Sequence, residues 1–124
     1  LMDTVEERSK DKSNTYVNLA VNYGGRAEIV ESVKAIAERV KNGTLKIEDI
    51  TEDTVSAGIY TAGQPDPDLI IRPSGEYRLS NFLLWQSAYA EIYIDDVLWP
   101  DYKPEDLDRA LEAYAKRNRR FGGV

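Results

Sequence analysis

Residues 68–81 read Asp-Leu-Ile-Ile-Arg-Pro-Ser-Gly-Glu-Tyr-Arg-Leu-Ser-Asn, and this stretch decides the fold. Its first five residues have Leu69, Ile70 and Ile71 at their centre without polar alternation, which is typical of a strand buried on both faces of a parallel sheet. Pro73 ends that strand because it has no backbone N–H to donate. Ser80 and Asn81 are common N-cap residues, so they predict a helix over 82–89. Strand, turn and helix in this order predict an α/β fold, with a parallel sheet flanked by helices.

The sequence on either side alternates between strand and helix patterns. Apolar, partly β-branched runs predict two more strands, at 16–23 and 90–94. Apolar residues at three- and four-residue steps predict an amphipathic helix over 27–41 that packs against the sheet, and Asn42-Gly43 supplies its left-handed stop. The other predicted helices are a short one from Thr51 to about residue 57 and a last one that opens at Pro104.

The composition disfavours several classes of protein. The 124 residues are 42% hydrophobic and 31% charged, the balance of one ordinary domain or part of one. A net charge of -6 disfavours a nucleic-acid partner. Because the chain has no cysteine and no histidine, its chemistry must use carboxylates, arginines, hydroxyls, backbone amides or a metal. No apolar run long enough to cross a bilayer and no signal peptide is visible, which predicts a cytoplasmic protein.

The polar turn after the central strand is a candidate anion site. Arg72 and Arg78 carry charges that they cannot lose, and Ser80 adds a hydroxyl. Gly75 lets the backbone approach a ligand closely. Because ligands bind at the carboxyl ends of strands in open parallel sheets, this set suits a phosphate or a diphosphate. The alternative is that the arginines only pair with Glu76 or with other surface acids.

Glu91 is a second candidate site residue. It lies inside the apolar segment 90–94, where an unpaired carboxylate would be costly. One interpretation is a salt bridge with an arginine of the polar turn. The other is a ligand to a divalent metal that bridges the protein and a substrate diphosphate. The basic cluster at the end of the chain is by itself typical of a solvated helix end.

Seven blocks of sequence carry a resemblance when they are taken in order. They are Asn22-Tyr23-Gly24-Gly25-Arg26, Asp68-Leu69-Ile70-Ile71-Arg72, Ser74-Gly75-Glu76, Arg78-Leu79-Ser80-Asn81-Phe82-Leu83-Leu84-Trp85-Gln86, Ala88-Tyr89-Ala90-Glu91, Leu98-Trp99-Pro100-Asp101 and Arg120-Phe121-Gly122. From about Val17 onward, the chain resembles the C-terminal half of cis-prenyltransferases, the undecaprenyl diphosphate synthase family. The resemblance implies that residues 16–124 are the C-terminal part of one such domain, and that 1–15 are a flexible or fragment-edge segment.

The resemblance implies a transferase that condenses isopentenyl diphosphate onto an allylic diphosphate, either farnesyl or geranylgeranyl diphosphate, and forms cis double bonds. It implies no catalytic side chain in this half of the protein. Glu76 would only orient the turn that carries Arg72 and Arg78, which we call the arginine turn. By motif position, the ligands of isopentenyl diphosphate are Arg72, Arg78, Ser80 and the backbone at Leu79. The lipid product implies a cytoplasmic protein with peripheral contact to a membrane.

Further implications concern the metal and the assembly. Glu91 would help to bind Mg2+ as the cofactor. Arg120 and Gly122, the terminal Arg-x-Gly of the family, would reach across a homodimer and complete the isopentenyl diphosphate site of the other subunit. The predicted helix over 82–89 and the strand after it would form much of the dimer interface.

The chain also departs from the family pattern. The family's aspartate loop, which binds the allylic diphosphate and metal, has no counterpart here, so we expect the chain alone to be inactive. Pro73 stands where threonine is usual, and Tyr77 stands where many bacterial members have histidine. Two alternatives remain: a non-catalytic cis-prenyltransferase-like partner subunit, and a generic phosphate- or nucleotide-binding α/β module. The intact turn with Arg72 and Arg78 argues against the first.

Overall fold

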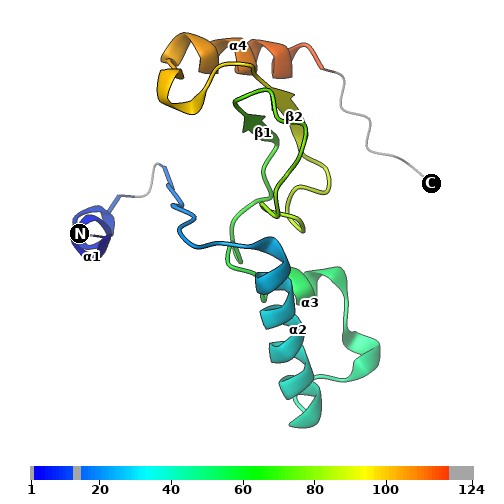
Figure 1. Cartoon of the computed structure of the whole chain (residues 1–124). Coiled ribbons are helices and arrows are strands. Elements are labelled where there is room, and N and C mark those ends of the chain that lie inside the picture. The colour runs from blue at the N-terminus through cyan, green and yellow to red at the C-terminus, as the bar shows by residue number, and fades with distance from the viewer. Residues whose placement is uncertain (1, 13–14, 118–124) are drawn as a thin grey trace.

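The computed structural model describes residues 2–12 and 15–117. Figure 1 labels the helices and strands. Along the chain, the elements are α1 (Met2–Ser9), α2 (Gly25–Lys41), the 3-10 turn Ile47–Asp49, α3 (Glu52–Ser56), β1 (Leu69–Arg72), β2 (Glu91–Ile94), the 3-10 turn Trp99–Asp101 and α4 (Pro104–Ala115).

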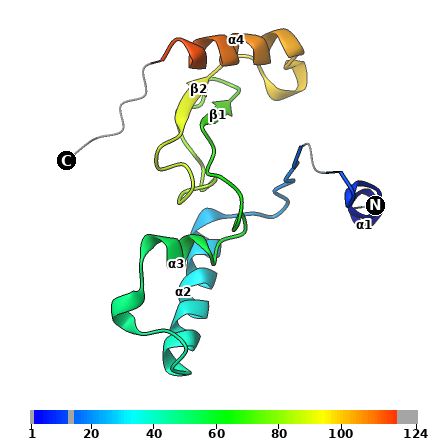
Figure 2. The same cartoon turned by 180° about the vertical axis from the view of Figure 1, so that it is seen from behind.

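The sheet has two parallel strands, as expected for an α/β fold. β1 pairs with β2 in a register that runs from Leu69 opposite Glu91 to Arg72 opposite Ile94. In Figures 1 and 2, α4 lies beyond the strands at one end of the molecule, and α2 lies beside α3 at the other end. The crossover from β1 to β2, residues 73–90, runs between these two ends. Only Ile70 of β1 is buried, so the strand is not fully covered on both faces by this chain.

The helix predicted over 82–89 is not formed, and turns take its place. Ser80, Asn81 and Leu83 have φ angles of 49°, 65° and 45°, which lie in the left-handed region and cannot start a right-handed helix. The cause is a tertiary contact. The backbone oxygen of Asn81 accepts a hydrogen bond from the N–H of Gly25 at 2.8 Å, and its side-chain oxygen accepts one from the N–H of Arg26 at 2.9 Å. Asn81 therefore caps α2 and not a helix of its own.

The strand predicted over 16–23 is also wrong, because these residues form an extended and bent segment outside the sheet. Tyr16, Val17, Leu19 and Val21 are 70–78% exposed. The apolar pattern suits a strand, but a strand needs a neighbour to pair its backbone groups. No other strand among the described residues pairs with this segment.

The local helix signals are confirmed. α2 ends at the predicted stop, where Gly43 has φ 71°. α3 follows Thr51, whose side chain and that of Thr54 form a capping box. α4 opens at Pro104, and its N-cap N–H at Lys103 donates to Asp106.

Within the segment 1–15, residues 2–9 form α1, which lies apart from the other elements in both views. None of the helices in the described part of the chain is long and apolar enough to cross a membrane.

The buried face of α2 is polar, and the helix packs against α3 instead of the predicted sheet. Val30 and Val33, which were expected to face the sheet, are 51% and 53% exposed. Besides Gly25 at its start, the buried positions are Glu28, Ser32 and Ile36, spaced by four residues. The hydroxyl of Ser32 donates to the backbone oxygen of Val55 at 3.0 Å. A Cβ at Gly58 would lie 2.3 Å from that hydroxyl oxygen, so only glycine permits this approach.

Glu28 is the centre of the helical end. Its side chain is fully buried and accepts hydrogen bonds from the hydroxyl of Tyr23, from the N–H of Tyr60 at 3.1 Å and from the amide of Gln86 at 3.2 and 3.3 Å. Burial, followed by the contact with Glu28, raises the pKa of Tyr23 to about 12. Because the amide of Gln86 also donates to Thr61 at 3.1 Å, this cluster ties α2 and the turn after α3 to the crossover.

We predict that Gln86→Leu destabilises the chain, because it leaves the buried carboxylate of Glu28 without its amide donor. The loss in unfolding free energy should be about 1.5–3 kcal/mol, the typical contribution of a hydrogen bond to a charged group. Urea unfolding followed by circular dichroism measures it. The matched control is Gln64→Leu, since Gln64 is exposed and pairs only with exposed Asn18. An equal loss in both variants would contradict the role of the Glu28 cluster.

Candidate functional site

The turn that follows β1 is held by backbone hydrogen bonds to the loop that follows β2. Ser74 and Gly75 both have positive φ, at 76° and 63°. The N–H of Ser74 donates to the backbone oxygen of Val97 at 2.9 Å, and the N–H of Gly75 donates to that of Asp95 at 2.8 Å. The N–H of Asp95 in turn donates to the backbone oxygen of Arg72 at 3.0 Å. Backbone pairing therefore continues past the end of the sheet and fixes where the arginine turn begins.

Glycine is required at the second position of this turn. A Cβ at Gly75 would lie 2.8 Å from the carboxylate of Asp96, and the positive φ adds strain for any other residue. Gly75 was expected to let the backbone approach a ligand. The structure adds a second reason for glycine at this position, which is that the turn after β1 packs closely against the loop after β2.

Arg72 and Arg78 line one cavity, of about 510 Å³. The cavity also borders Leu79, Glu76 and Tyr77 from the crossover, and its wall on the sheet side is apolar, with Ile70, Ile92, Ile94 and Phe82. Because strands alternate between faces, Ile70 of β1 and Ile92 and Ile94 of β2 share one face of the sheet. The site therefore combines two permanent positive charges with a hydrocarbon wall.

The two arginines differ in the hydrogen-bond partners of their guanidinium groups. Arg78 pairs with Glu76, and their side chains are 61% and 41% exposed. An exposed pair of this kind contributes little, so Arg78 can exchange Glu76 for a ligand oxygen at small cost. The Nε of Arg72 is buried and has no hydrogen-bond partner among the described residues. A buried donor without an acceptor is costly, which favours a ligand at this position.

Other predicted site residues lie elsewhere. Ser80 is exposed in the left-handed turn and does not border the cavity. Glu91 does not border it either, and it lies on the opposite face of β2 from Ile92. Its carboxylate accepts a hydrogen bond from Arg117 at 2.6 Å. This contact is the salt bridge that we considered, but with an arginine that follows α4 and not one from the polar turn. Arg120 and Gly122 lie outside the described residues.

The described residues contain no group of three or more acidic, histidine or cysteine side chains that could hold a metal ion. Glu91 offers a single carboxylate that is already paired with Arg117. The residues present therefore do not fit a magnesium site made by this chain alone.

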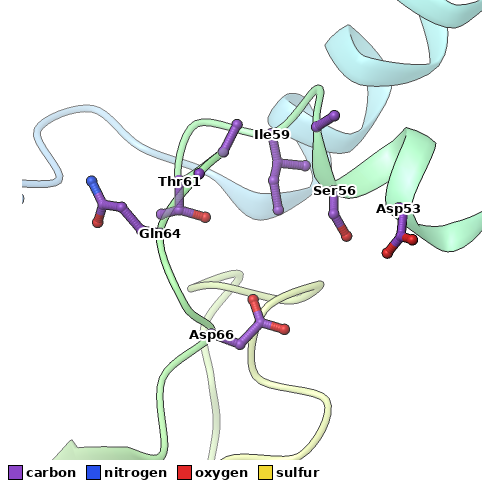
Figure 3. Close-up of a pocket in the computed structure, with 9 residues that line it drawn as sticks. Asp53, Ser56, Ile59, Thr61, Gln64 and Asp66 are labelled. Carbon is purple, nitrogen blue, oxygen red and sulfur yellow. The ribbon is translucent and has the colours of Figure 1, made fainter.

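A smaller cavity, of about 230 Å³, lies between α3 and the segment that leads to β1. Figure 3 shows its lining, in which Ser56, Thr61 and Gln64 accompany the carboxylates of Asp53 and Asp66. The sequence did not predict this cavity. Its lining includes no arginine or lysine, so it does not suit an anionic ligand.

Sequence reasoning missed the apolar half of the arginine cavity. Ile70, Ile92 and Ile94 were identified only as strand residues. Strand alternation could have identified them. Ile70 lies two residues before Arg72 on the same face of β1, and Ile94 of β2 is paired with Arg72. Phe82 carried no such signal, because its position depends on the turn that replaces the predicted helix.

Comparisons with known proteins agree with this geometry. The family model described as "Putative undecaprenyl diphosphate synthase" matches residues 1–122. An isoprenyl transferase from Clostridium perfringens is 54% identical over 118 residues, which are 95% of this chain and 47% of that protein. The chain therefore spans about half the length of the curated relatives it matches.

Solved structures give the same result. Lavandulyl diphosphate synthase from Lavandula x intermedia, solved in complex with dimethylallyl diphosphate, matches with a TM-score of 0.94 and 42% identity, over 98% of this chain and 52% of that one. A probable undecaprenyl diphosphate synthase from Campylobacter jejuni matches with a TM-score of 0.77 and 35% identity, over 98% and 54%. The chain belongs to the undecaprenyl diphosphate synthase family of prenyltransferases.

Proposed function

We propose that this chain supplies the isopentenyl diphosphate site of a cis-prenyltransferase, which condenses isopentenyl diphosphate onto farnesyl or geranylgeranyl diphosphate to make a cis-polyprenyl diphosphate. The observation that carries the proposal is the cavity shared by Arg72, Arg78 and an apolar wall. Isopentenyl diphosphate has the same two parts, a diphosphate and a short branched hydrocarbon. The membership of the family supports the same reaction class.

Each part of the ligand has a matching group in the cavity. The diphosphate oxygens accept hydrogen bonds from Arg72, whose buried Nε is otherwise unsatisfied, and from Arg78 after it leaves Glu76. The isopentenyl group contacts the apolar wall beside Ile92 and Phe82. Ser80 and the backbone at Leu79 remain proposed ligands, and Ser80 must move to reach the cavity from its exposed position.

The chemistry requires no nucleophilic side chain. The allylic diphosphate breaks its C–O bond, the double bond of isopentenyl diphosphate attacks the allylic cation, and a proton is then lost from the product cation. Fixed positive groups help such reactions by holding the reacting double bond in place and by neutralising diphosphate charge. Arg72 and Arg78 do this for the isopentenyl partner. Glu76 orients Arg78 when the site is empty.

Magnesium is proposed only for the assembled protein. Glu91 stays the proposed ligand from this chain, although one carboxylate paired with Arg117 does not complete a site. We therefore derive no step of the reaction through the metal. If the proposal is right, Glu91→Gln in a full-length protein carrying these residues weakens magnesium-dependent binding of isopentenyl diphosphate, as measured by calorimetry with magnesium and with chelator. Equal behaviour of the two proteins would remove Glu91 from the metal site.

We also propose that the full-length protein is a homodimer in which Arg120 and Gly122 reach the site of the other subunit. The aromatic side chain of Tyr89 in the crossover supports an interface there, since it is 73% exposed and does not line the arginine cavity. Sedimentation of the full-length protein tests this proposal. A monomer at the concentrations used for activity would contradict it.

The first prediction from this site concerns affinity. Arg78→Ala should weaken the binding of isopentenyl diphosphate to the chain by about tenfold or more, because a charge-assisted hydrogen bond contributes about 1.5–3 kcal/mol. Isothermal titration calorimetry measures it. The matched control is Arg39→Ala, which removes an exposed arginine in the last turn of α2 and should leave affinity unchanged. Unchanged affinity in Arg78→Ala would remove this arginine from the site.

The second prediction concerns turnover. The purified chain, mixed with magnesium, farnesyl diphosphate and radiolabelled isopentenyl diphosphate, should give no polyprenyl product, because no residue assigned here binds the allylic diphosphate. A full-length relative such as the isoprenyl transferase of Clostridium perfringens is the positive control. Any labelled polyprenyl product from the chain alone would show that the allylic site is present.

A further inference from the structure

Asp95 lies at the centre of the contacts that shape the arginine turn. Its backbone N–H donates to Arg72 at 3.0 Å, and its backbone oxygen accepts from Gly75 at 2.8 Å. Its side chain is only 9% exposed. One carboxylate oxygen of Asp95 accepts a hydrogen bond from the N–H of Val97 at 3.1 Å, and Val97 in turn accepts from Ser74. The position of Asp95 therefore decides the position of the turn.

The charge of Asp95 is balanced from α4. Its second carboxylate oxygen is buried, has no hydrogen-bond partner in the described part of the chain, and lies 3.6 Å from the guanidinium of Arg109. Among the described residues, Arg109 is the one cation in an ion pair with Asp95. A nearly buried carboxylate is costly without such a partner, so Asp95 depends on Arg109.

Arg109 joins two acids that would otherwise repel each other. It also pairs with Asp106, whose side chain is 10% exposed. The backbone N–H of Lys103, followed by Arg109, lowers the pKa of Asp106, so Asp106 carries a charge at neutral pH. Tyr102 borders the same group. Burial, followed by the charge of Asp95, raises the pKa of Tyr102, so its hydroxyl stays neutral and supplies no positive charge.

Loss of Arg109 would leave two like charges side by side, both with little access to water. α4 is a regular helix of 12 residues, whereas the loop of Asp95 is not part of either strand. The loop would therefore shift toward solvent and would lengthen the hydrogen bonds from Ser74 and Gly75. The turn that carries Arg72 and Arg78 would lose its anchor.

We propose that Arg109 is a positioning residue for the anion site, which holds the arginine turn in place through Asp95 without touching the ligand. The inference rests on the proposed function for the identity of the ligand. The affinity of the site would then depend on the charge that Arg109 places beside Asp95.

Four variants of the full chain test the proposal by calorimetry with isopentenyl diphosphate. Arg109→Ala should weaken binding by about tenfold, the size of a typical coupling between neighbouring residues. Arg109→Lys should recover most of the affinity because it keeps the charge. Asp95→Asn alone should weaken binding less than Arg109→Ala does, since the amide oxygen still accepts from Val97 and no uncompensated charge is left beside Asp106. The double variant Asp95→Asn with Arg109→Ala should bind better than Arg109→Ala alone, because one of the two like charges is gone.

A second readout does not depend on the ligand. Amide hydrogen exchange at Ser74 and Gly75 should be about tenfold faster in Arg109→Ala. Exchange at Gly25, whose N–H is bonded to Asn81, should stay the same. Thermal unfolding confirms that each variant is folded at the temperature used. A general loss of structure would speed exchange at all three positions and would not be repaired by Asp95→Asn.

The outcomes separate the two proposals. Native affinity and native exchange in Arg109→Ala would overturn the positioning role, while loss of binding in Arg78→Ala would still support the proposed function. If the native chain binds no isopentenyl diphosphate, the proposed function fails, and exchange at Ser74 and Gly75 still decides whether Arg109 holds the turn.

Discussion

The crossover between the two parallel strands, residues 73–90, contains no helix, and the structure depends on how its two ends are fixed. Near β1, the N–H groups of Ser74 and Gly75 bond to the loop after β2. Near β2, Gln86 enters the buried cluster of Glu28. Two paired strands of four residues would be marginal alone, so these polar anchors supply what regular secondary structure does not. The arginine cavity exists because the segment between the anchors is stretched over the sheet.

The parts of the fold that the sequence predicted are those set by local rules. β1, β2, α2, α3 and α4 follow from apolar runs, capping residues and the positions of proline and glycine. Two of the failures, the helix over 82–89 and the strand over 16–23, have one cause, which is that the deciding partner is far away in sequence. Asn81 has a good N-cap side chain but uses it on α2, 55 residues away. The segment 16–23 has a strand pattern but no strand to pair with among the described residues.

The same distinction applies to the candidate site. Arg72 and Arg78 were predicted because residue type and position after a strand suffice to suggest an anion site, and the structure places both on one cavity. The face on which Glu91 lies also follows from strand alternation, once the register of β1 and β2 is known. The link from Asp95 to Arg109 could not be predicted, because it joins a loop to a helix across 14 positions with no periodic pattern. Polar contacts between elements that are distant in sequence therefore determine features of the site that local sequence patterns do not predict.

Stability and binding draw on different polar groups in this chain. The side chain of Glu28 is fully buried and both of its carboxylate oxygens accept hydrogen bonds, so it stabilises one conformation and leaves no carboxylate oxygen for a ligand. The arginine cavity has the opposite properties, since Arg72 keeps a buried donor free and Arg78 holds only an exposed partner. A polar group left unsatisfied in the folded state costs stability that a ligand oxygen can restore on binding. Gln86, Asp95 and Tyr102 also have a buried side-chain atom without a partner among the described residues, but none of these three lines the arginine cavity. Arg72 does line it, so this cavity is where a ligand oxygen can restore the lost stability.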